Sequence, residues 1–326
     1  MDTKIRVGLC GYGNLGKGVE KAIVYNPDME LKVIFTRRNP EEVAKLTTTP
    51  VVSVDEKDEW VDELDVVIMA GGSATDLPVQ VPEFAGKFNT VDSFDTHADI
   101  KTLYEKVNVK AFMGKKCSII STGWDPGMFS LQRAYFKSIL PNGVDYTFWG
   151  PGLSQGHSDA IRRIEGVKKA AQYTIPIVDA IDRVRNGETP KFTPREKHNR
   201  DCFVVVENGA DESKIEAEIK NMPKYFADYD TEVHFISEEE FDKQHTDMPH
   251  GGNVIRVGKT GEGNKQEIEF SLKLSSNPEF TGSILLAFAR AAYNMSRVQG
   301  YGAKTVLDIP PRMLLPDEYD ELFKLI

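Results

Sequence analysis

Residues 5–16 read IRVGLCGYGNLG, and this stretch decides the fold of the first half of the chain. Its first six residues form a short apolar run with the length of a buried strand. Gly11, Gly13 and Gly16 follow in G-x-G-x-x-G spacing, and a helical pattern of apolar residues comes next. The first glycine permits a tight turn, the second lets a pyrophosphate approach the backbone, and the third lets helix and strand pack closely. The stretch therefore predicts a dinucleotide-binding fold.

The next strand, around residues 31–35, leads into Thr36, Arg37 and Arg38. In folds that bind NAD, an acidic residue about twenty residues beyond the glycine loop binds the ribose 2′-hydroxyl, and this segment has no carboxylate there. A guanidinium group binds a 2′-phosphate that a carboxylate would repel. The arginine pair therefore predicts NADP as the cofactor. The alternative is that the two arginines only occupy a solvated loop.

Short apolar segments continue to alternate with helical ones as far as residue 123. We expect strands at residues 64–70, 88–93 and 117–123, and a helix at 96–115. This alternation predicts a Rossmann-like, doubly wound parallel sheet with helices on both faces, an α/β fold. Ligands bind such sheets at the carboxyl ends of the strands. The segments expected near the cofactor are residues 71–73, 92–95 and 122–125.

The second half of the chain has a different pattern, which predicts an α+β domain. We expect strands at residues 145–150, 202–208, 231–237, 254–259 and 266–275, and helices at 158–172 and 212–222. Apolar residues alternate along the last of these strands, as in an antiparallel sheet with one wet face. An apolar helix at 283–298 is expected to return to the first domain. We therefore expect a discontinuous dinucleotide-binding domain, 1–123 plus 283–326, and a substrate-binding and dimerisation region, 124–282.

The composition excludes several classes of partner. A net charge of −10 argues against nucleic acid and against an anionic membrane surface. The apolar runs are too short to span a bilayer, and the N-terminal residues have no signal-peptide core. Cys10, Cys117 and Cys202 are scattered and odd in number, which is typical of a reducing compartment. We expect a cytoplasmic protein.

Three carboxylates follow expected strands of the first half: Asp92, Asp95 and Asp125. Carboxylates near a nicotinamide would attract a substrate ammonium and could take up a proton. Hydride transfer from an amine carbon leaves an iminium cation, which negative charge stabilises. The alternative is that one carboxylate only caps the following helix, and Asp92 is the preferred candidate for that role. No lysine stands out as a general base.

Long motifs of the chain resemble the meso-diaminopimelate dehydrogenase family nearly from end to end. They are GYGNLG, FTRR, GGSATD, STGWDPGMFS, FWGPGLSQGHSDA and HTDMPHGG. The resemblance implies a homodimer that uses NADP in lysine and diaminopimelate biosynthesis. It also implies reversible oxidative deamination of the D-configured carbon of meso-2,6-diaminoheptanedioate, giving L-2-amino-6-oxoheptanedioate, ammonia and NADPH.

The resemblance also implies roles for residues of both domains. Asp95 and Asp125 would contact the reacting amine, and the distal L-amino acid end would meet Thr174, Arg200, His250 and Asn277. An arginine such as Arg200 can bind a carboxylate through two parallel hydrogen bonds. The cofactor set is expected to comprise Gly11, Tyr12, Gly13, Asn14, Leu15, Gly16, Thr36, Arg37, Arg38, Gly71, Gly72, Ser73, Thr75 and Asp92.

Other residues are expected around the substrate. Gln155, Gly156 and Ser158 lie in a glycine-containing loop that we expect to line the substrate pocket. Apolar walls could come from Trp124, Phe148 and Trp149, although aromatic residues more often belong to a core. His245 and His250 match no familiar spacing of metal ligands, so no metal is expected.

Two other classes of function remain open on the sequence. One is a different NADP-dependent oxidoreductase of the same architecture, such as a semialdehyde or dihydrodipicolinate-type reductase, and a substrate panel would distinguish it. The other is a non-catalytic NADP sensor, which would bind NADPH but form none from an amino acid.

Overall fold

The computed structural model describes residues 4–316 and 319–326. The chain forms two compact units, one built from Met1–Leu131 with Pro278–Ile326 and the other from Gln132–Asn277. These boundaries lie eight and five residues from the expected 123/124 and 282/283, respectively. Helices α5 (Met128–Ile139) and α11 (Asn277–Arg297) carry the chain across them. No helix within the described ranges is long and apolar enough to span a bilayer.

The first unit contains a seven-stranded sheet in the described residues, with strand order β14-β6-β5-β4-β1-β2-β3. Its strands are β1 (Ile5–Cys10), β2 (Met29–Thr36), β3 (Val51–Ser53), β4 (Val66–Met69), β5 (Asn89–Asp92), β6 (Cys117–Ile119) and β14 (Gly302–Lys304). Every neighbouring pair is parallel. The strand order reverses between β1 and β4, and ligands bind such sheets at this reversal. The predicted doubly wound fold is confirmed.

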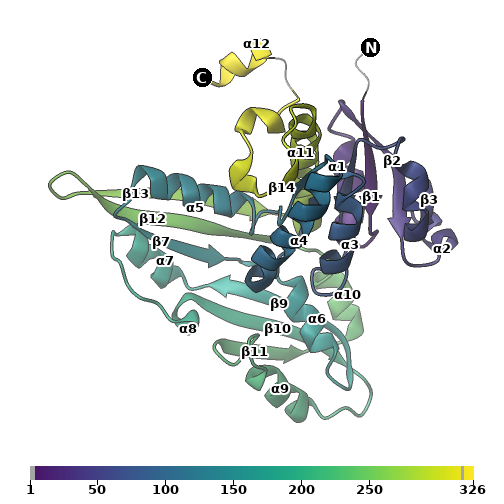
Figure 1. Ribbon diagram of the computed structural model, residues 1–326. Helices are drawn as coiled ribbons and strands as arrows, with labels where there is room; N and C mark the ends of the chain where they lie inside the picture. The colour runs from purple at the N-terminus through teal and green to yellow at the C-terminus, as the bar shows by residue number, and fades with distance from the viewer. Residues whose placement is uncertain (1–3, 317–318) are drawn as a thin grey trace. The chain divides into compact units, whose positions relative to one another are not determined.

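Alternate residues of the central strands face opposite sides of this sheet. Val66 and Ile68 of β4 belong to one hydrophobic cluster, while Val67 and Met69 belong to another. The first cluster includes side chains of α1 and α11, and the second includes side chains of α3 and α4. The helices of this unit are α1 (Asn14–Ile23), α2 (Pro40–Ala44), α3 (Leu77–Ala85), α4 (Ile100–Met113) and α12 (Tyr319–Leu322), with α11. Helices thus cover both faces, as Figure 1 shows.

Helices α1 and α11 approach each other through glycines. A Cβ added at Gly18 would lie 2.3 Å from the carbonyl oxygen of Pro278, and one added at Gly282 would lie 2.7 Å from the backbone nitrogen of Val19. Such distances permit only glycine without a shift of backbone. The apolar helix expected at 283–298 is therefore α11, and it packs closely against the N-terminal part of the chain (Figure 1).

The second unit contains two smaller sheets in the described residues. One has the order β11-β10-β9-β8, in which only β10 and β11 are parallel, and the other is an antiparallel sheet with the order β13-β12-β7. The strands are β7 (Val144–Trp149), β8 (Gly152–Leu153), β9 (Val167–Pro176), β10 (His198–Val206), β11 (Asp230–Phe235), β12 (His250–Thr260) and β13 (Asn264–Leu274). The helices are α6 (Gln155–Arg162), α7 (Val178–Arg185), α8 (Pro194–Lys197), α9 (Glu212–Asn221) and α10 (Glu238–Gln244).

The helix expected at 158–172 is wrong beyond residue 162. Helix α6 ends at Arg162, and Gly166 with φ +86° turns the chain into β9. Segment VKKAAQ then forms a strand that pairs with β10 along nearly its whole length. Alanine and lysine favour helices, but pairing in the middle of a sheet overrides that weak preference. The short strands β3, β8 and β14 were not expected at all.

Candidate functional site

The glycine loop between β1 and α1 has the geometry that each glycine predicts. Gly11 has φ +100°, and a Cβ there would lie 2.9 Å from the carbonyl oxygen of Ala70. A Cβ at Gly16 would lie 2.3 Å from the carbonyl oxygen of Gly11, so the turn and the helix pack without a gap. A Cβ at Gly13 would meet no atom within 4 Å. The backbone is therefore open to a ligand at Gly13, where the first-turn N–H groups of α1 begin.

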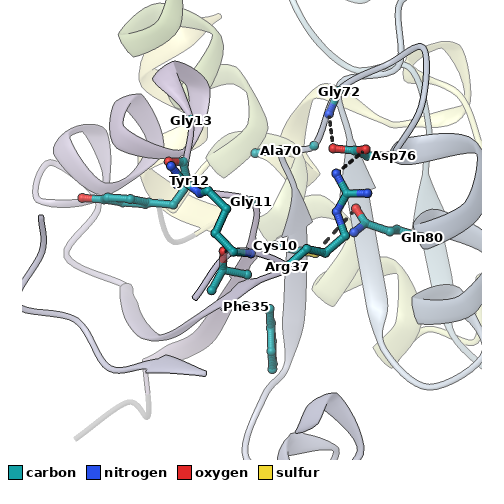
Figure 2. A pocket seen from close by; sticks show the side chains of 13 residues that line it. Cys10, Gly11, Tyr12, Gly13, Phe35, Arg37, Ala70, Gly72, Asp76 and Gln80 are labelled. Atoms are coloured by element: carbon teal, nitrogen blue, oxygen red, sulfur yellow. Dashed lines mark hydrogen bonds and ion pairs between the residues drawn. The ribbon is translucent and has the colours of Figure 1, made fainter. Parts of the chain in front are cut away.

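A cavity of about 270 Å³ lies beside this loop (Figure 2). Eight residues of the predicted cofactor set line it: Gly11, Tyr12, Gly13, Thr36, Arg37, Arg38, Gly71 and Gly72. Five lining residues were not predicted: Cys10, Phe35, Ala70, Asp76 and Gln80. Six predicted residues are outside the lining: Asn14, Leu15, Gly16, Ser73, Thr75 and Asp92. Ser73 instead lines a second cavity of about 400 Å³.

The two arginines that follow β2 are held differently. The Arg37 guanidinium donates to the carboxylate of Asp76 at 2.6 Å, as Figure 2 shows. The Arg37 side chain is 59% exposed and that of Asp76 is 16% exposed. Arg38 donates to the carbonyl oxygen of Tyr12 at 2.6 Å. Asp76 also accepts the Gly72 N–H at 3.1 Å, so this carboxylate joins the ends of β2 and β4.

These residues fit a phosphate-bearing dinucleotide. The open backbone at Gly13 and the start of α1 suit a pyrophosphate, because backbone N–H groups and the helix dipole favour an anion there. Two guanidinium groups on the wall of the same cavity suit a further phosphate. Asp76 was missed because it lies 39 residues from Arg37 in the chain. Only the fold of α3 against β2 brings the pair together.

The structure separates the three strand-end aspartates by burial. Asp95 is exposed, and its backbone N–H donates to Ser73 Oγ at 2.8 Å. Asp125 is half-buried in the loop after β6, next to the buried Trp124. Asp92 is 0% exposed and so presents no atom to a ligand. Exposure thus leaves Asp95 and Asp125 as the two carboxylates that a substrate could reach.

The alternative that Asp92 caps a helix is wrong. The Asp92 carboxylate accepts the N–H groups of Phe94 and Ser121, and neither belongs to a helix. The next helical turn and α4 begin after Thr96 and Asp99 respectively.

In the second unit, a buried arginine stands at the centre of the predicted distal set. Arg200 of β10 is 7% exposed, pairs in register with Thr174 of β9, and donates to its hydroxyl. Its guanidinium carbon lies 3.9 Å from the centre of the Tyr229 ring. Burial lowers the pKa of Arg200, an effect that Tyr229 partly offsets. Among the described residues no carboxylate forms an ion pair with it, and its Nε has no hydrogen-bond partner.

Unpartnered polar atoms gather around Arg200. Thr231 of β11 is its register partner on the other side, and the Thr231 hydroxyl is buried without a partner among the described residues. Gln172 of β9, two residues before Thr174, is fully buried, and neither atom of its amide group has a partner in that part of the chain. Sequence patterns do not reveal such groups, because Gln172 and Thr231 follow no motif.

Burial lowers the pKa of each of the three neighbouring histidines. Burial, with help from Lys197 and Arg200, lowers the pKa of His198 to about 3. Burial and the charge of Arg200 lower the pKa of His157 to about 4. Burial also lowers the pKa of His250, although a backbone hydrogen bond at Gly251 opposes this. These histidines therefore add little positive charge to that of Arg200 and Lys197.

The remaining predicted pocket residues have mixed environments. Ser158 donates to the carbonyl oxygen of Ser154 and accepts the N–H of Gln172, while a Cβ at Gly156 would meet nothing within 4 Å. Trp149 stacks on His198 with 5.5 Å between ring centres. Phe148 is 0% exposed inside a hydrophobic cluster, so it is a core residue and the expectation of a pocket wall is wrong.

Asn277 and Gln155 both interact with Met248. The Asn277 backbone N–H donates to the carbonyl oxygen of Met248 at 2.8 Å, and the Gln155 amide approaches its sulfur at 3.6 Å.

The two histidines considered as metal ligands do not form a metal site together. His245 stacks on Phe203, with 4.1 Å between ring centres, and His250 lies at the start of β12. A different group brings ligand atoms within 4.8 Å of one another in the described residues, namely Asp201, Glu232 and His234. His234 and Asp201 already bind each other at 2.7 Å on a partly exposed sheet surface.

Comparisons with known proteins show which family the chain resembles. Residues 123–276 match the family model described as the diaminopimelic acid dehydrogenase C-terminal domain. The chain is 60% identical to the meso-diaminopimelate D-dehydrogenase of Ureibacillus thermosphaericus, over 99% of each chain. The structure of the DAP dehydrogenase of Corynebacterium glutamicum in complex with DAP matches with a TM-score of 0.93 and 48% identity, over 99% of each chain.

A second solved structure carries a cofactor. An engineered D-amino acid dehydrogenase bound to NADP+ matches with a TM-score of 0.89 and 46% identity, again over 99% of each chain. Identity at this level over nearly the whole length is far above what a shared fold alone would give. The chain belongs to the meso-diaminopimelate D-dehydrogenase family.

Proposed function

We propose that this chain catalyses the NADP-dependent oxidative deamination of meso-2,6-diaminoheptanedioate at its D-configured carbon. Water is consumed, and the products are L-2-amino-6-oxoheptanedioate, ammonia and NADPH. The observation that carries the proposal is the buried Arg200 guanidinium, which no carboxylate of the described residues neutralises. A buried charge is costly unless it is paired, so this position favours a ligand that brings a carboxylate. The DAP-bound relative supports the assignment of that ligand.

The first unit would hold the cofactor. Gly11, Gly13 and the start of α1 would bind the pyrophosphate, and Arg37 with Arg38 would bind the 2′-phosphate. The relative bound to NADP+ supports this choice. When bound, NADP accepts the hydride from the amine-bearing carbon.

Asp95 and Asp125 would act on the reacting amine. A carboxylate can take the proton of the substrate ammonium, and only the neutral amine has a lone pair to stabilise the departure of hydride. The same negative charges stabilise the iminium cation that forms on the substrate. Water would then add to this cation, and one of the two carboxylates would accept its proton. Deamination should accordingly become faster as pH rises through the pKa of the bound amine.

The second unit would hold the distal end of the substrate. Arg200 is fixed by Thr174 on one side and by the Tyr229 ring on the other, so little side-chain freedom is lost when a carboxylate binds. With His250 and Asn277 this set would recognise an L-amino acid end. Fixing that end determines which face of the reacting carbon meets the cofactor, so orientation becomes part of catalysis.

The test is the formation of NADPH, followed by its absorbance, from purified protein, NADP and a panel of amino acids. Meso-diaminopimelate should be oxidised fastest, the LL isomer should be inert, and D-lysine and D-alanine should be poor because they lack the distal carboxylate. Arg200→Met should lower kcat/KM for the meso compound by about 30- to 5,000-fold, which corresponds to about 2–5 kcal/mol. Arg195→Met is the matched control, because Arg195 is an exposed arginine of the same unit that pairs with Asp230.

Each other class of function predicts a different result. An NADP sensor would bind NADPH but form none from any member of the panel. Equal rates with D-alanine and the meso compound would contradict recognition of the distal end, and rapid oxidation of the LL isomer would contradict the stereochemistry.

We also propose that the protein is a cytoplasmic homodimer. The three cysteines are buried and free, which suits a reducing compartment, and light scattering would measure the oligomeric state.

A further inference from the structure

Asp92 joins the two loops that carry the exposed aspartates. It is the last residue of β5, and its Oδ1 accepts the N–H of Phe94 at 2.9 Å and the N–H of Ser121 at 2.9 Å. Its own carbonyl oxygen accepts the N–H of Thr122 at 2.7 Å. The first bond shapes the loop that leads to Asp95, and the other two fix the end of β6. We call these three hydrogen bonds the strand-end tie.

The backbone at Ser121 departs from the ordinary strand conformation. Ser121 has φ +54°, a region that residues other than glycine rarely adopt. In this conformation its N–H reaches Asp92, and the chain turns from β6 towards Asp125, four residues later. Surrounding contacts must hold such a backbone in place. Asp92 supplies two of those contacts, one at Ser121 and one at Thr122.

The chemistry of Asp92 is unusual for a purely structural residue. Its Oδ2 is fully buried and has no hydrogen-bond partner among the described residues, and the same is true of Ser121 Oγ. Burial raises the pKa of Asp92 to about 6, although the two N–H groups that it accepts act in the opposite direction. A buried carboxylate with an unpaired oxygen costs stability. Asp92 therefore does not maximise the stability of the fold.

Asn89 shows that the same connection can be made without a charge. It lies at the other end of β5, where its Oδ1 accepts the N–H of Cys117 at 2.9 Å and its Nδ2 donates to the carbonyl oxygen of Asp65 at 2.8 Å. A neutral amide thus bridges β5 to β6 with both of its polar atoms satisfied. At the carboxyl end, the chain uses a carboxylate instead, and N–H bonds to a charged oxygen are stronger than bonds to a neutral one.

We propose that Asp92 is a positioning residue of the catalytic site, because the strand-end tie fixes the loops that present Asp95 and Asp125 to the reacting amine. The inference rests on the proposed function. Asp92 itself touches neither substrate nor cofactor. Its role is to hold two carboxylates at the distance that the reaction needs, and a displacement of about 1 Å can lower a rate about a hundredfold.

The test compares Asp92→Ala and Asp92→Asn with the control Asn89→Ala, which breaks the bridge at the opposite end of the same strands. We expect Asp92→Ala to lower kcat by about a hundredfold, with the NADPH dissociation constant unchanged within about twofold. Asp92→Asn keeps an oxygen acceptor of weaker strength and should lower kcat by about tenfold. Asn89→Ala should lower the melting temperature but leave kcat per folded molecule within about twofold of wild type.

Each outcome bears on the inference. If Asp92→Ala does not fold, Asp92→Asn decides alone, and an unchanged kcat in that variant overturns the inference. A loss of kcat in Asn89→Ala as large as that in Asp92→Ala also overturns it, because the effect would then be general loosening of the sheet. A wild-type chain that forms no NADPH from the meso compound refutes the proposed function. Active wild type with an equally active Asp92→Ala refutes only the role of Asp92.

Discussion

Replacing Arg37 and Arg38 by alanine tests the cofactor assignment most directly. A hydrogen bond between charged groups contributes about 1.5–3 kcal/mol. Arg37 has to loosen or share its contact with Asp76 when a phosphate binds, and a surface ion pair of that kind contributes about 0.2–1 kcal/mol. The net contribution of Arg37 is then about 0.5–2.8 kcal/mol. Arg37→Ala should therefore weaken NADP binding about 2- to 100-fold, with NAD binding nearly unchanged.

Asp76 provides the second half of this experiment. Asp76→Asn removes the ion pair and the negative charge on the cavity wall, so NADP should bind more tightly by up to about fivefold. In Arg37→Ala this gain should be smaller, because the competing ion pair is already gone. Isothermal titration calorimetry with NADP and NAD at one ionic strength measures all of these constants. An NADP/NAD affinity ratio that stays within about twofold of wild type in the double variant Arg37→Ala/Arg38→Ala would refute the reasoning.

Three further predictions concern catalysis, pH and packing. Asp125→Asn should lower kcat by about 10²–10⁴-fold while NADPH still binds, and wild-type turnover would remove Asp125 from the mechanism. His198 accepts the N–H of Trp149 only when neutral, and its pKa falls from 6.5 to about 3, so folding stability should decline below pH 6.5 by up to about 1.4 kcal/mol per unit. Urea unfolding at several pH values should show a shallower decline in His198→Gln, and parallel curves would contradict the assignment. Gly18→Ala should destabilise the protein by about 1–3 kcal/mol in thermal unfolding, whereas Gly86→Ala should be nearly neutral, since its Cβ would meet nothing closer than 3.8 Å.

The parts of the fold that depend on local chemistry were predictable from the sequence. Gly11 and Gly16 have steric reasons to be glycine, and Gly13 leaves the backbone open to a ligand, so their spacing reveals β1 and α1. The boundaries of β9 were not predictable, because VKKAAQ favours a helix and only its partners in the sheet make it a strand. A preference of a few tenths of a kcal/mol per residue is easily outweighed by such pairing.

The candidate site also has a part that the sequence predicts and a part that it does not. Arg37 and Arg38 follow a strand at a characteristic distance from the glycine loop, and such a spacing can be recognised in the sequence alone. Asp76 binds Arg37 although 39 residues separate them in the chain. Gln172, whose buried amide has no partner among the described residues, belongs to no motif. The burial of Asp92 was also invisible, since an aspartate at a strand end looks the same in sequence whether it faces solvent or the core.

The close glycine contact between α1 and α11 has a consequence for how the chain folds while it is being synthesised. Side chains of α11, among them Leu285, Leu286 and Phe288, complete the hydrophobic cluster that covers one face of the parallel sheet. A ribosome delivers β1 to β6 first, then the whole second unit, and only then α11. Until that helix emerges, the face with Val7 and Leu9 has no cover from it. The nascent N-terminal half therefore exposes this apolar face for an interval set by the translation of residues 132–277, and apolar surface exposed in this way is prone to aggregation.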